Sequence, residues 1–366
     1  MSALDGLRAR TSEALQDDRL RASVKNVVTG MVEKREVALD GLENPDELRD
    51  AARTVRAGIL SRLPEILETW STNLEANGGH VHWAVDAEEA CAIALDITRR
   101  HGARKVTKGK SMASEEIHLN DAFERDGLEV VETDLGEFII QLAGETPSHL
   151  IVPAIHKDRH EVGDLFTQDA GTKVGPDIPE EAAYARDRLR SAFLEADVGV
   201  TGVNFAVADT GSIALVENEG NGRMCTSLPK VHIAIMGMER IVEDWSQLDL
   251  MLSLLGRSAT GQPLTVYNNI LSGPRRDGEV DGPEEMHVIV IDNGRSNILG
   301  TEFIEALNCI RCGACLNVCP VYRNVGGHAY DSVYSGPIGA VLTPLLEPEN
   351  EAAKELSEAS SLCGAC

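Results

Sequence analysis

Four cysteines lie within eleven residues near the end of the chain, at Cys309, Cys312, Cys315 and Cys319, and Pro320 follows the last of them. The spacing is C-x2-C-x2-C-x3-C-P, which is typical of ferredoxin-type cluster motifs. In such a run three thiolates can hold one iron–sulfur cluster, while the fourth points to another cluster. The motif therefore predicts iron–sulfur chemistry and the transfer of single electrons.

Two other uses of closely spaced cysteines fit this run less well. Zinc sites usually pair two short Cys or His units across a longer spacer, and no such spacer is present here. Disulfides are not favoured either. The first ten residues carry an acid and lack the apolar core of an export signal, so we expect a reducing, cytoplasmic location.

A cysteine that serves a second cluster requires a second cysteine group, and Cys363-Gly-Ala-Cys366 provides one. When its letters are aligned with the first run, Ser360 falls opposite Cys309, and the counterpart of Cys319 falls four residues beyond the last one. We therefore expect a fragment whose first cluster lacks its fourth ligand. We also expect the region after about residue 308 to be the least native part of the chain.

The composition is that of an ordinary globular protein, in its hydrophobic share of 43% and in its share of charged residues. A length of 366 residues allows one large domain or two, with a small module in addition. The net charge of −25 would repel phosphate backbones and argues against a nucleic-acid partner. Apolar runs are too short for a transmembrane segment, so none is expected.

Hydrophobic patterning divides the chain into three parts. Residues 1–79 are predicted to be helical, as a layer packed on the next domain or, alternatively, as a docking arm for a partner. Residues 80–298 alternate short strands, including one at 149–153, with helices. They predict an α/β domain whose parallel or mixed sheet is covered on both faces. Residues 299–366 read as a helical ferredoxin-type module that is incomplete at its C-terminus.

Two stretches of the α/β part, together with Gly211 and Ser212 of a predicted turn, could form a ligand pocket. Lys108, Lys110 and Ser111 lie between a predicted strand and a helix start, where an anion could bind, although the full phosphate-loop spacing is absent. Glu217 precedes a glycine-rich loop and could act as a base or nucleophile. The alternatives are a plain turn with solvated lysines and a solvated loop. The candidate pocket residues are Lys108, Lys110, Ser111, Gly211, Ser212, Glu217, Asn218 and Gly220.

Two smaller motifs favour structural roles. Asp209-Thr210-Gly211 separates two predicted strands and indicates a tight hairpin. His156 and His160 have the spacing of metal ligands on a helix, but the glutamate of the metalloprotease motif is missing, so we favour a polar helix start.

The α/β part resembles a known family in five stretches: Lys108–Ile117, Glu132–Leu142, Pro153–Lys157, Gly202–Ser212 and Asn218–Arg223. These stretches look like the lactate-utilisation domain. With the cysteine motif behind it, nearly the whole chain resembles the lactate utilisation protein B family, the iron–sulfur component of a bacterial L-lactate oxidation system.

The resemblance implies a fold shared with sugar-phosphate isomerases and CoA transferases, and electron transport during oxidation of L-lactate to pyruvate. It implies two [4Fe–4S] clusters and two partner subunits, one cysteine-rich and one a stand-alone relative of the α/β domain. It assigns Cys309, Cys312 and Cys315 to the first cluster, and Cys319, Cys363 and Cys366 to the second, whose fourth ligand stays unassigned. The alternative is a transferase-like or isomerase-like site in the α/β domain, with the clusters in an accessory role.

Overall fold

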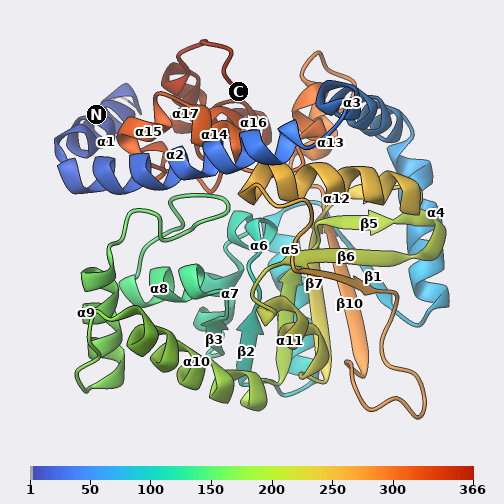
Figure 1. Cartoon of the computed structure of the whole chain (residues 1–366). Helices are drawn as coiled ribbons and strands as arrows, with labels where there is room; N and C mark the ends of the chain where they lie inside the picture. Colours follow the sequence, from blue (N-terminus) through green and yellow to red (C-terminus); the bar gives the residue numbers. More distant parts are fainter. Residues whose placement is uncertain (1–2) are drawn as a thin grey trace.

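The computed structural model describes residues 3–366 and begins with four helices (Figure 1). They are α1 (Ala3–Gln16), α2 (Asp18–Asp40), α3 (Pro45–Ser61) and α4 (Leu63–Ala76). Asp17 starts α2 by accepting hydrogen bonds from two backbone amides of its first turn, and a proline in the first turn starts both α3 and α4. The helical structure predicted for this part is confirmed.

A six-stranded, wholly parallel sheet forms the centre of the α/β domain. Its strands lie in the order β1 (His80–Ala84), β10 (Glu285–Ile291), β7 (Val231–Gly237), β4 (Val198–Gly202), β2 (Lys105–Lys108) and β3 (Glu129–Glu132). Every residue of β7 is buried, as expected for a central strand covered on both faces. The fold class predicted from the alternation of strands and helices is confirmed.

Helices cover both faces of this sheet. They are α5 (Ala87–Arg100), α6 (Met112–Glu116), α7 (Leu119–Arg125), α8 (Leu135–Ala143), α9 (Arg159–Ala170), α10 (Ile178–Glu195) and α11 (Asn221–Ser227). One face packs against α5 and α7 through side chains such as Ile97 and Phe123. On the other face, α8 to α11 form a separate apolar cluster that includes Phe138, Phe166 and Cys225.

A second, four-stranded sheet was not predicted as a separate unit. Its order is β8 (Ile241–Val242), β5 (Phe205–Val207), β6 (Ser212–Glu217) and β9 (Tyr267–Leu271), and α12 (Trp245–Thr260) contacts it. The predicted hairpin at Asp209–Gly211 is confirmed, because β5 and β6 pair antiparallel on either side of η1 (Ala208–Thr210). Gly211 has φ +63°, and a Cβ there would lie 2.2 Å from the Leu74 nitrogen, so the turn requires glycine.

The strand predicted at 149–153 is wrong. The chain turns there because the amides of Ile151 and Val152 donate to Nδ1 of His149, at 3.0 and 3.2 Å. Side-chain acceptors of this kind compete with strand pairing for backbone donors. The amide of Ser148 closes the loop by donating to the carbonyl of Pro153 at 3.0 Å.

The C-terminal part consists of short helices. They are α13 (Arg295–Ile298), η2 (Ile304–Asn308), α14 (Ala314–Val318), α15 (Tyr322–Val325), η3 (His328–Tyr330), α16 (Gly336–Leu346), α17 (Glu351–Lys354) and η4 (Glu355–Ala359). The region after about residue 308 is expected to be the least native part, yet residues 309–359 are well packed. Leu316, Tyr322 and Leu342 are fully buried and belong to the same apolar core as the second sheet. Residues 360–366 are exposed and have no regular secondary structure.

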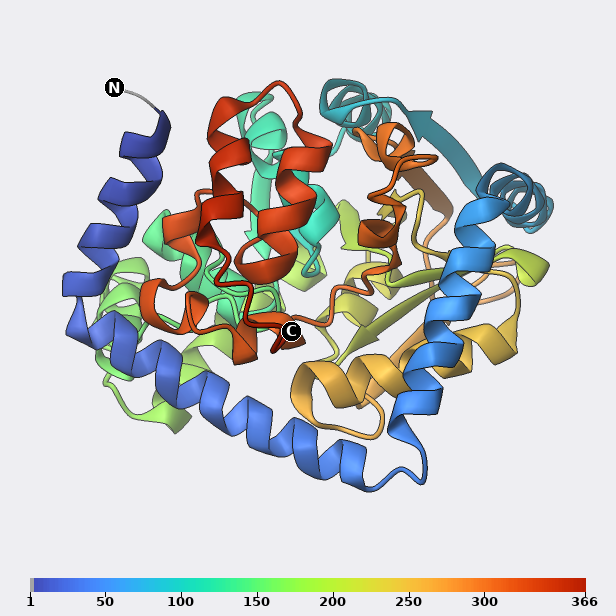
Figure 2. The same cartoon turned by 90° about the horizontal axis from the view of Figure 1, so that it is seen from above.

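The N-terminal helices pack on the C-terminal helices as well as on the α/β domain. In Figure 2, α1 and α2 border the group of C-terminal helices on two sides. The long helix α2 contacts α12, α14 and α15, whereas α3 contacts α12 and η2. Val24 and Val28 of α2 are completely buried. These helices therefore form a layer that joins the cysteine region to the rest of the protein.

Candidate iron–sulfur centre and adjoining cavity

The first cysteine run folds as a tight loop followed by α14. Two residues in the loop, Arg311 and Gly313, have positive φ values, which bend the chain back on itself. The amide of Arg311 donates to Sγ of Cys309, and the amide of Tyr322 donates to Sγ of Cys319, both at 3.4 Å. Hydrogen bonds to sulfur are one of the means by which a protein stabilises and tunes an iron–sulfur cluster.

The donor set and its spacing fit a cluster. Zinc held by thiolates at about 2.3 Å would bring the sulfur atoms within about 4 Å of one another. Among the described residues, the groups with three ligand atoms within 4.8 Å of one another include no cysteine. No three cysteine sulfur atoms among the described residues are thus close enough together to share one zinc ion, and the C-x2-C-x2-C-x3-C-P spacing is that of a cluster motif.

The second cysteine group lies in the exposed end of the chain. Cys363 and Cys366 are exposed, whereas Cys319 is buried and Cys315 is half-buried. Burial raises the pKa of Cys315 to about 12, and the thiolates of Cys309, Cys312 and Cys366 add to this shift. The last cysteine is thus close enough to the first run to affect it electrostatically.

Two buried arginines and the largely buried Arg311 lie at the loop that begins at Cys309. Arg56 of α3 donates to the carbonyl of Leu307 at 2.8 Å, and Arg240 donates to the carbonyl of Cys309 at 3.1 Å. Arg311 lies over the ring of Tyr334, with 4.7 Å between its Cζ atom and the ring centroid. These cations come from three separate parts of the chain, and positive charge favours the more negative, reduced state of a cluster.

A cavity of about 450 Å³ lies beside this loop, at the carboxyl ends of the parallel strands. The residues after β2, from Gly109 onward, and the end of β4, at Thr201 and Gly202, line it. These two strands are neighbours, yet the chain runs outward from β2 to β3 and in the opposite direction from β4 to β7. Such a reversal of strand order is where open α/β sheets bind their ligands.

Arg311 of the cysteine loop and Tyr334, on whose ring it lies, also line this cavity. Glu239 joins the two parts: its carboxylate accepts from Arg295 Nε at 2.6 Å and from Arg311 Nη2 at 3.3 Å. Burial acts to raise the pKa of Glu239, but Arg295, Arg311 and Arg240 outweigh it and lower that pKa to about 2. Glu239 is therefore a permanent anion between two cations.

Four of the eight predicted pocket residues line the cavity, and they are Lys110, Ser111, Glu217 and Asn218. Lys108 does not. Its ammonium is fully buried, 2.8 Å from Glu132 Oε1 and in contact with Glu115. Burial opposes its charge, but these two carboxylates outweigh burial and raise the pKa of Lys108. The lysine is neither solvated nor available to an outside anion, so neither sequence interpretation holds for it.

The other three predicted pocket residues have structural roles. The carbonyl of Ser212 accepts a hydrogen bond from the buried Trp70 indole at 3.1 Å. Its neighbour Gly211 forms the hairpin turn, and Gly220 precedes α11 with a positive φ. All three lie outside the cavity lining.

Glu217 reaches the cavity, but its carboxylate is occupied. It accepts from the amides of Gly222 and Arg223, at 2.6 and 2.8 Å, and from the side chain of Asn269 at 2.8 Å. These bonds satisfy free amides at the start of α11. The arrangement suits a helix cap better than a general base.

Several cavity residues had no signal in the sequence. Glu239, Arg240, Arg295 and Tyr334 come from distant segments and carry no recognisable spacing. Arg311 could have been found, because it stands inside the cysteine motif.

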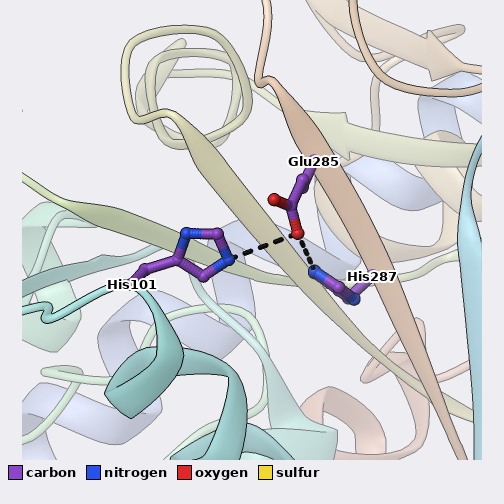
Figure 3. A group of neighbouring side chains, drawn as sticks. All are labelled: His101, Glu285 and His287. Carbon is purple, nitrogen blue, oxygen red and sulfur yellow. Dashed lines mark hydrogen bonds and ion pairs between the residues drawn. The ribbon is translucent and has the colours of Figure 1, made fainter.

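Two groups of potential metal ligands occur among the described residues outside the cysteines. One consists of His101, Glu285 and His287 (Figure 3). Burial, together with the neighbouring His80 and His82, lowers the pKa of His287 to about 4.

The other group consists of Glu145, His156 and His328, in which Glu145 Oε2 lies 2.6 Å from His156 Nε2. His160 is not part of it. His156 precedes α9, so the two histidines do not share a helix.

Comparisons with known proteins match two domains and several relatives to this chain. Residues 67–291 match the LUD domain, and residues 305–366 match a 4Fe-4S dicluster domain. Lactate utilization protein B of Shouchella clausii is 52% identical over 98% of this chain and 75% of that protein. The protein of the same name from Bacillus subtilis is 48% identical over 99% of this chain and 76% of that protein.

Two other similarities were found. An uncharacterized electron transport protein of Escherichia coli is 48% identical over 98% of this chain and 75% of that protein. A solved DUF162 family protein from Deinococcus radiodurans covers 63% of this chain and 98% of its own, at 17% identity and a TM-score of 0.36, which is too remote to support an argument. Within residues 3–366, none of the helices combines the length and apolar character needed to cross a membrane. By its two domains and its relatives, the chain belongs to the lactate utilization protein B family.

Proposed function

We propose that this chain is an iron–sulfur electron-transfer protein that acts in the oxidation of L-lactate to pyruvate. The observation that carries this proposal is the loop from Cys309 to Cys319, where thiolates, amide donors and buried arginines converge. The names of the relatives, lactate utilization protein B and electron transport protein, support the same function.

Two [4Fe–4S] clusters are proposed, and each supplies a centre that accepts one electron at a time when bound. The proposed ligands are Cys309, Cys312 and Cys315 for the first cluster, and Cys319, Cys363 and Cys366 for the second. The protein's own part is to hydrogen-bond the sulfur atoms, to balance negative charge with arginine, and to exclude water with the buried side chains around Leu316.

The proposed partners are two subunits of the same lactate oxidation system, one cysteine-rich and one related to the α/β domain. The proposed division of labour places electron transfer in residues 299–366 and small-molecule binding in residues 80–298. Residues 1–79 would connect them. The contacts of α2 with α12, α14 and α15 support this last role.

The electron-transfer function is tested by Cys312→Ser in the full chain, reconstituted with iron and sulfide without oxygen. We expect lactate-dependent reduction by the assembled system to be lost, because one thiolate of the first cluster is missing, while circular dichroism shows that the α/β domain stays folded. Cys91→Ser is the matched control, since Cys91 is a half-buried residue of α5 far from the cysteine run in sequence. Normal electron transfer in Cys312→Ser would refute the assignment.

A second proposed activity is the binding of a small molecule in the cavity, because Arg311 and Tyr334 bring the cysteine loop to its wall. L-Lactate and pyruvate are the probes, measured by calorimetry with the reconstituted chain. In Lys110→Met we expect roughly tenfold weaker binding, because a cation that lines the cavity is removed. Lys157→Met, which changes a lysine outside the cavity, should bind as the wild type does. Equal affinity in both variants would argue against this site.

A further inference from the structure

A group of potential metal-ligand side chains lies at the amino end of β10. The cavity lies at the opposite, carboxyl ends of the strands. Glu285 and His287 are the first and third residues of β10, and residues two apart on a strand point to the same face. His101 follows the last residue of α5, the helix that packs on this face against β1 and β10. Figure 3 shows the two imidazole rings directed toward the one carboxylate. The two sites are therefore independent.

Two of the three pairs of ligand atoms already have the spacing of a coordination sphere. Oε2 of Glu285 lies 3.2 Å from Nε2 of His101 and 3.3 Å from Nε2 of His287, and all three atoms are within 4.8 Å of one another. Two ligands bound tetrahedrally to zinc at about 2.0–2.1 Å lie about 3.3–3.4 Å apart. A zinc-sized ion therefore requires only small movements of these side chains.

An outer layer of histidines holds His287 in place. Nε2 of His82 lies 3.1 Å from Nδ1 of His287, and the ring of His80 stacks on that of His287 with 4.8 Å between their centroids. The hydrogen bond at Nδ1 leaves Nε2 to face Glu285. A partner on the second ring nitrogen is the usual companion of a metal-bound histidine. Four of the ten histidines in the chain thus gather around the start of β10, and they are His80, His82, His101 and His287.

The comparable group at Glu145, His156 and His328 lacks these features. The ammonium of Lys157 pairs with the second oxygen of Glu145, so a cation already neutralises this carboxylate. Nε2 of His328 lies 2.7 Å from the carbonyl of Thr146 and is engaged there. No cation pairs with Glu285 among the described residues apart from the two histidines of its own group.

We propose that His101, Glu285 and His287 bind a divalent metal ion of the zinc class, and that His82 orients His287. The set of two imidazoles and one carboxylate is a known zinc donor set that leaves one position open. Glu285 is 40% exposed at its side chain and His101 is 29% exposed, so water can complete the coordination. The ion ties the end of α5 to the start of β10.

The test uses the full chain with its clusters reconstituted, so that the cysteines are occupied. Cobalt(II) is the first probe, because nitrogen and oxygen ligands give visible d–d bands without the thiolate charge-transfer band that cysteine binding adds. We expect one equivalent to bind with the first kind of spectrum. Zinc(II) should displace it and raise the melting temperature of the wild type.

Three variants and one control decide the assignment. His101→Ala and Glu285→Gln should each lose the d–d bands and the thermal shift by zinc. His82→Phe should weaken affinity roughly 10- to 100-fold, because it removes only the orienting partner. His118→Ala, which changes an exposed histidine outside the group, should behave as the wild type. The proposal fails if Glu285→Gln binds cobalt as the wild type does, or if only thiolate-type spectra appear. Cluster reduction is not the readout, so the result is separate from that for electron transfer.

Discussion

At the scale of single residues, buried charge decides which side chains are structural. The sequence indicates that Lys108 either binds an anion or is solvated, yet its ammonium is buried with Glu132 and Glu115. Burial of an ion is costly unless its partner is present, and removal of one partner leaves the other uncompensated.

The variant Lys108→Met should therefore lower the free energy of unfolding by roughly 3–5 kcal/mol, since it strands the carboxylate of Glu132 in the interior. Urea unfolding followed by circular dichroism measures this. Lys230→Met is the control, because the side chain of Lys230 is 79% exposed and its nearest carboxylate oxygen is 3.9 Å away. Similar unfolding curves for both variants would show that the buried pair contributes little.

His149 predicts a pH dependence. Burial lowers the pKa of His149 to about 4; the hydrogen bond to Asn317 acts in the opposite direction, and the charge of Lys110 adds to the lowering. Between pH 6.5 and about 4 the unfolded chain binds the proton that the folded chain excludes. The contribution of His149 to the free energy of unfolding is therefore complete above the pKa of the unfolded chain. It is lost as the pH falls toward the folded pKa, by roughly 3 kcal/mol in total.

The measurement compares the free energy of unfolding at pH 7 and pH 5 in the wild type and in His149→Asn. Other buried histidines contribute to both proteins, so the difference between the two slopes isolates this residue. We expect a shallower slope in the variant, even though it is less stable at pH 7. Parallel slopes would mean that His149 is protonated as easily in the folded protein as in the unfolded one.

At the scale of elements, α2 connects the cysteine region to the α/β domain. Val24 and Val28 are completely buried on the face that contacts α12, α14 and α15, whereas Val37 of the same helix is 74% exposed. A valine truncated to alanine in a packed core loses the transfer energy of its methyl groups and leaves a cavity.

We expect Val28→Ala to lower the free energy of unfolding by roughly 2 kcal/mol, and Val37→Ala to leave it unchanged. Hydrogen exchange should also show faster opening of α14 and α15 in the first variant, because α2 packs directly on them. If Val28→Ala leaves the hydrogen-exchange protection of α14 unchanged, the connecting role of α2 is contradicted.

At the scale of the whole molecule, the cysteine loop and the cavity share one wall. Arg311 stands between Cys309 and Cys312 in the chain, lines the cavity, and pairs with Glu239 of the α/β domain. If a cluster binds at these cysteines as proposed, the charge of Arg311 would act on it as well as on a molecule in the cavity.

Arg311→Met should therefore lower the reduction potential of the first cluster by roughly tens of millivolts, since a nearby cation stabilises the added electron. A redox titration followed by electron paramagnetic resonance measures the shift. Lys354→Met changes an exposed lysine of the same region and should leave the potential unaltered. A potential in Arg311→Met equal to that of the wild type would show that this charge does not reach the cluster.

The sequence by itself determined the iron–sulfur motif, the α/β alternation and the β5–β6 hairpin. Each of these is a local pattern: cysteine spacing, the periods of helix and strand, and a turn at Gly211. Such patterns can be predicted because they depend on residues that lie close together in the sequence.

Only the tertiary structure decided what surrounds these patterns. It buried Lys108, made Glu217 a helix cap and turned His149–Pro153 away from a strand. It also brought Arg240 and Glu239 to the cysteine loop from about seventy residues away. Burial and charge pairing depend on which distant segments meet, and loop closure over such separations leaves no periodic signal in the sequence.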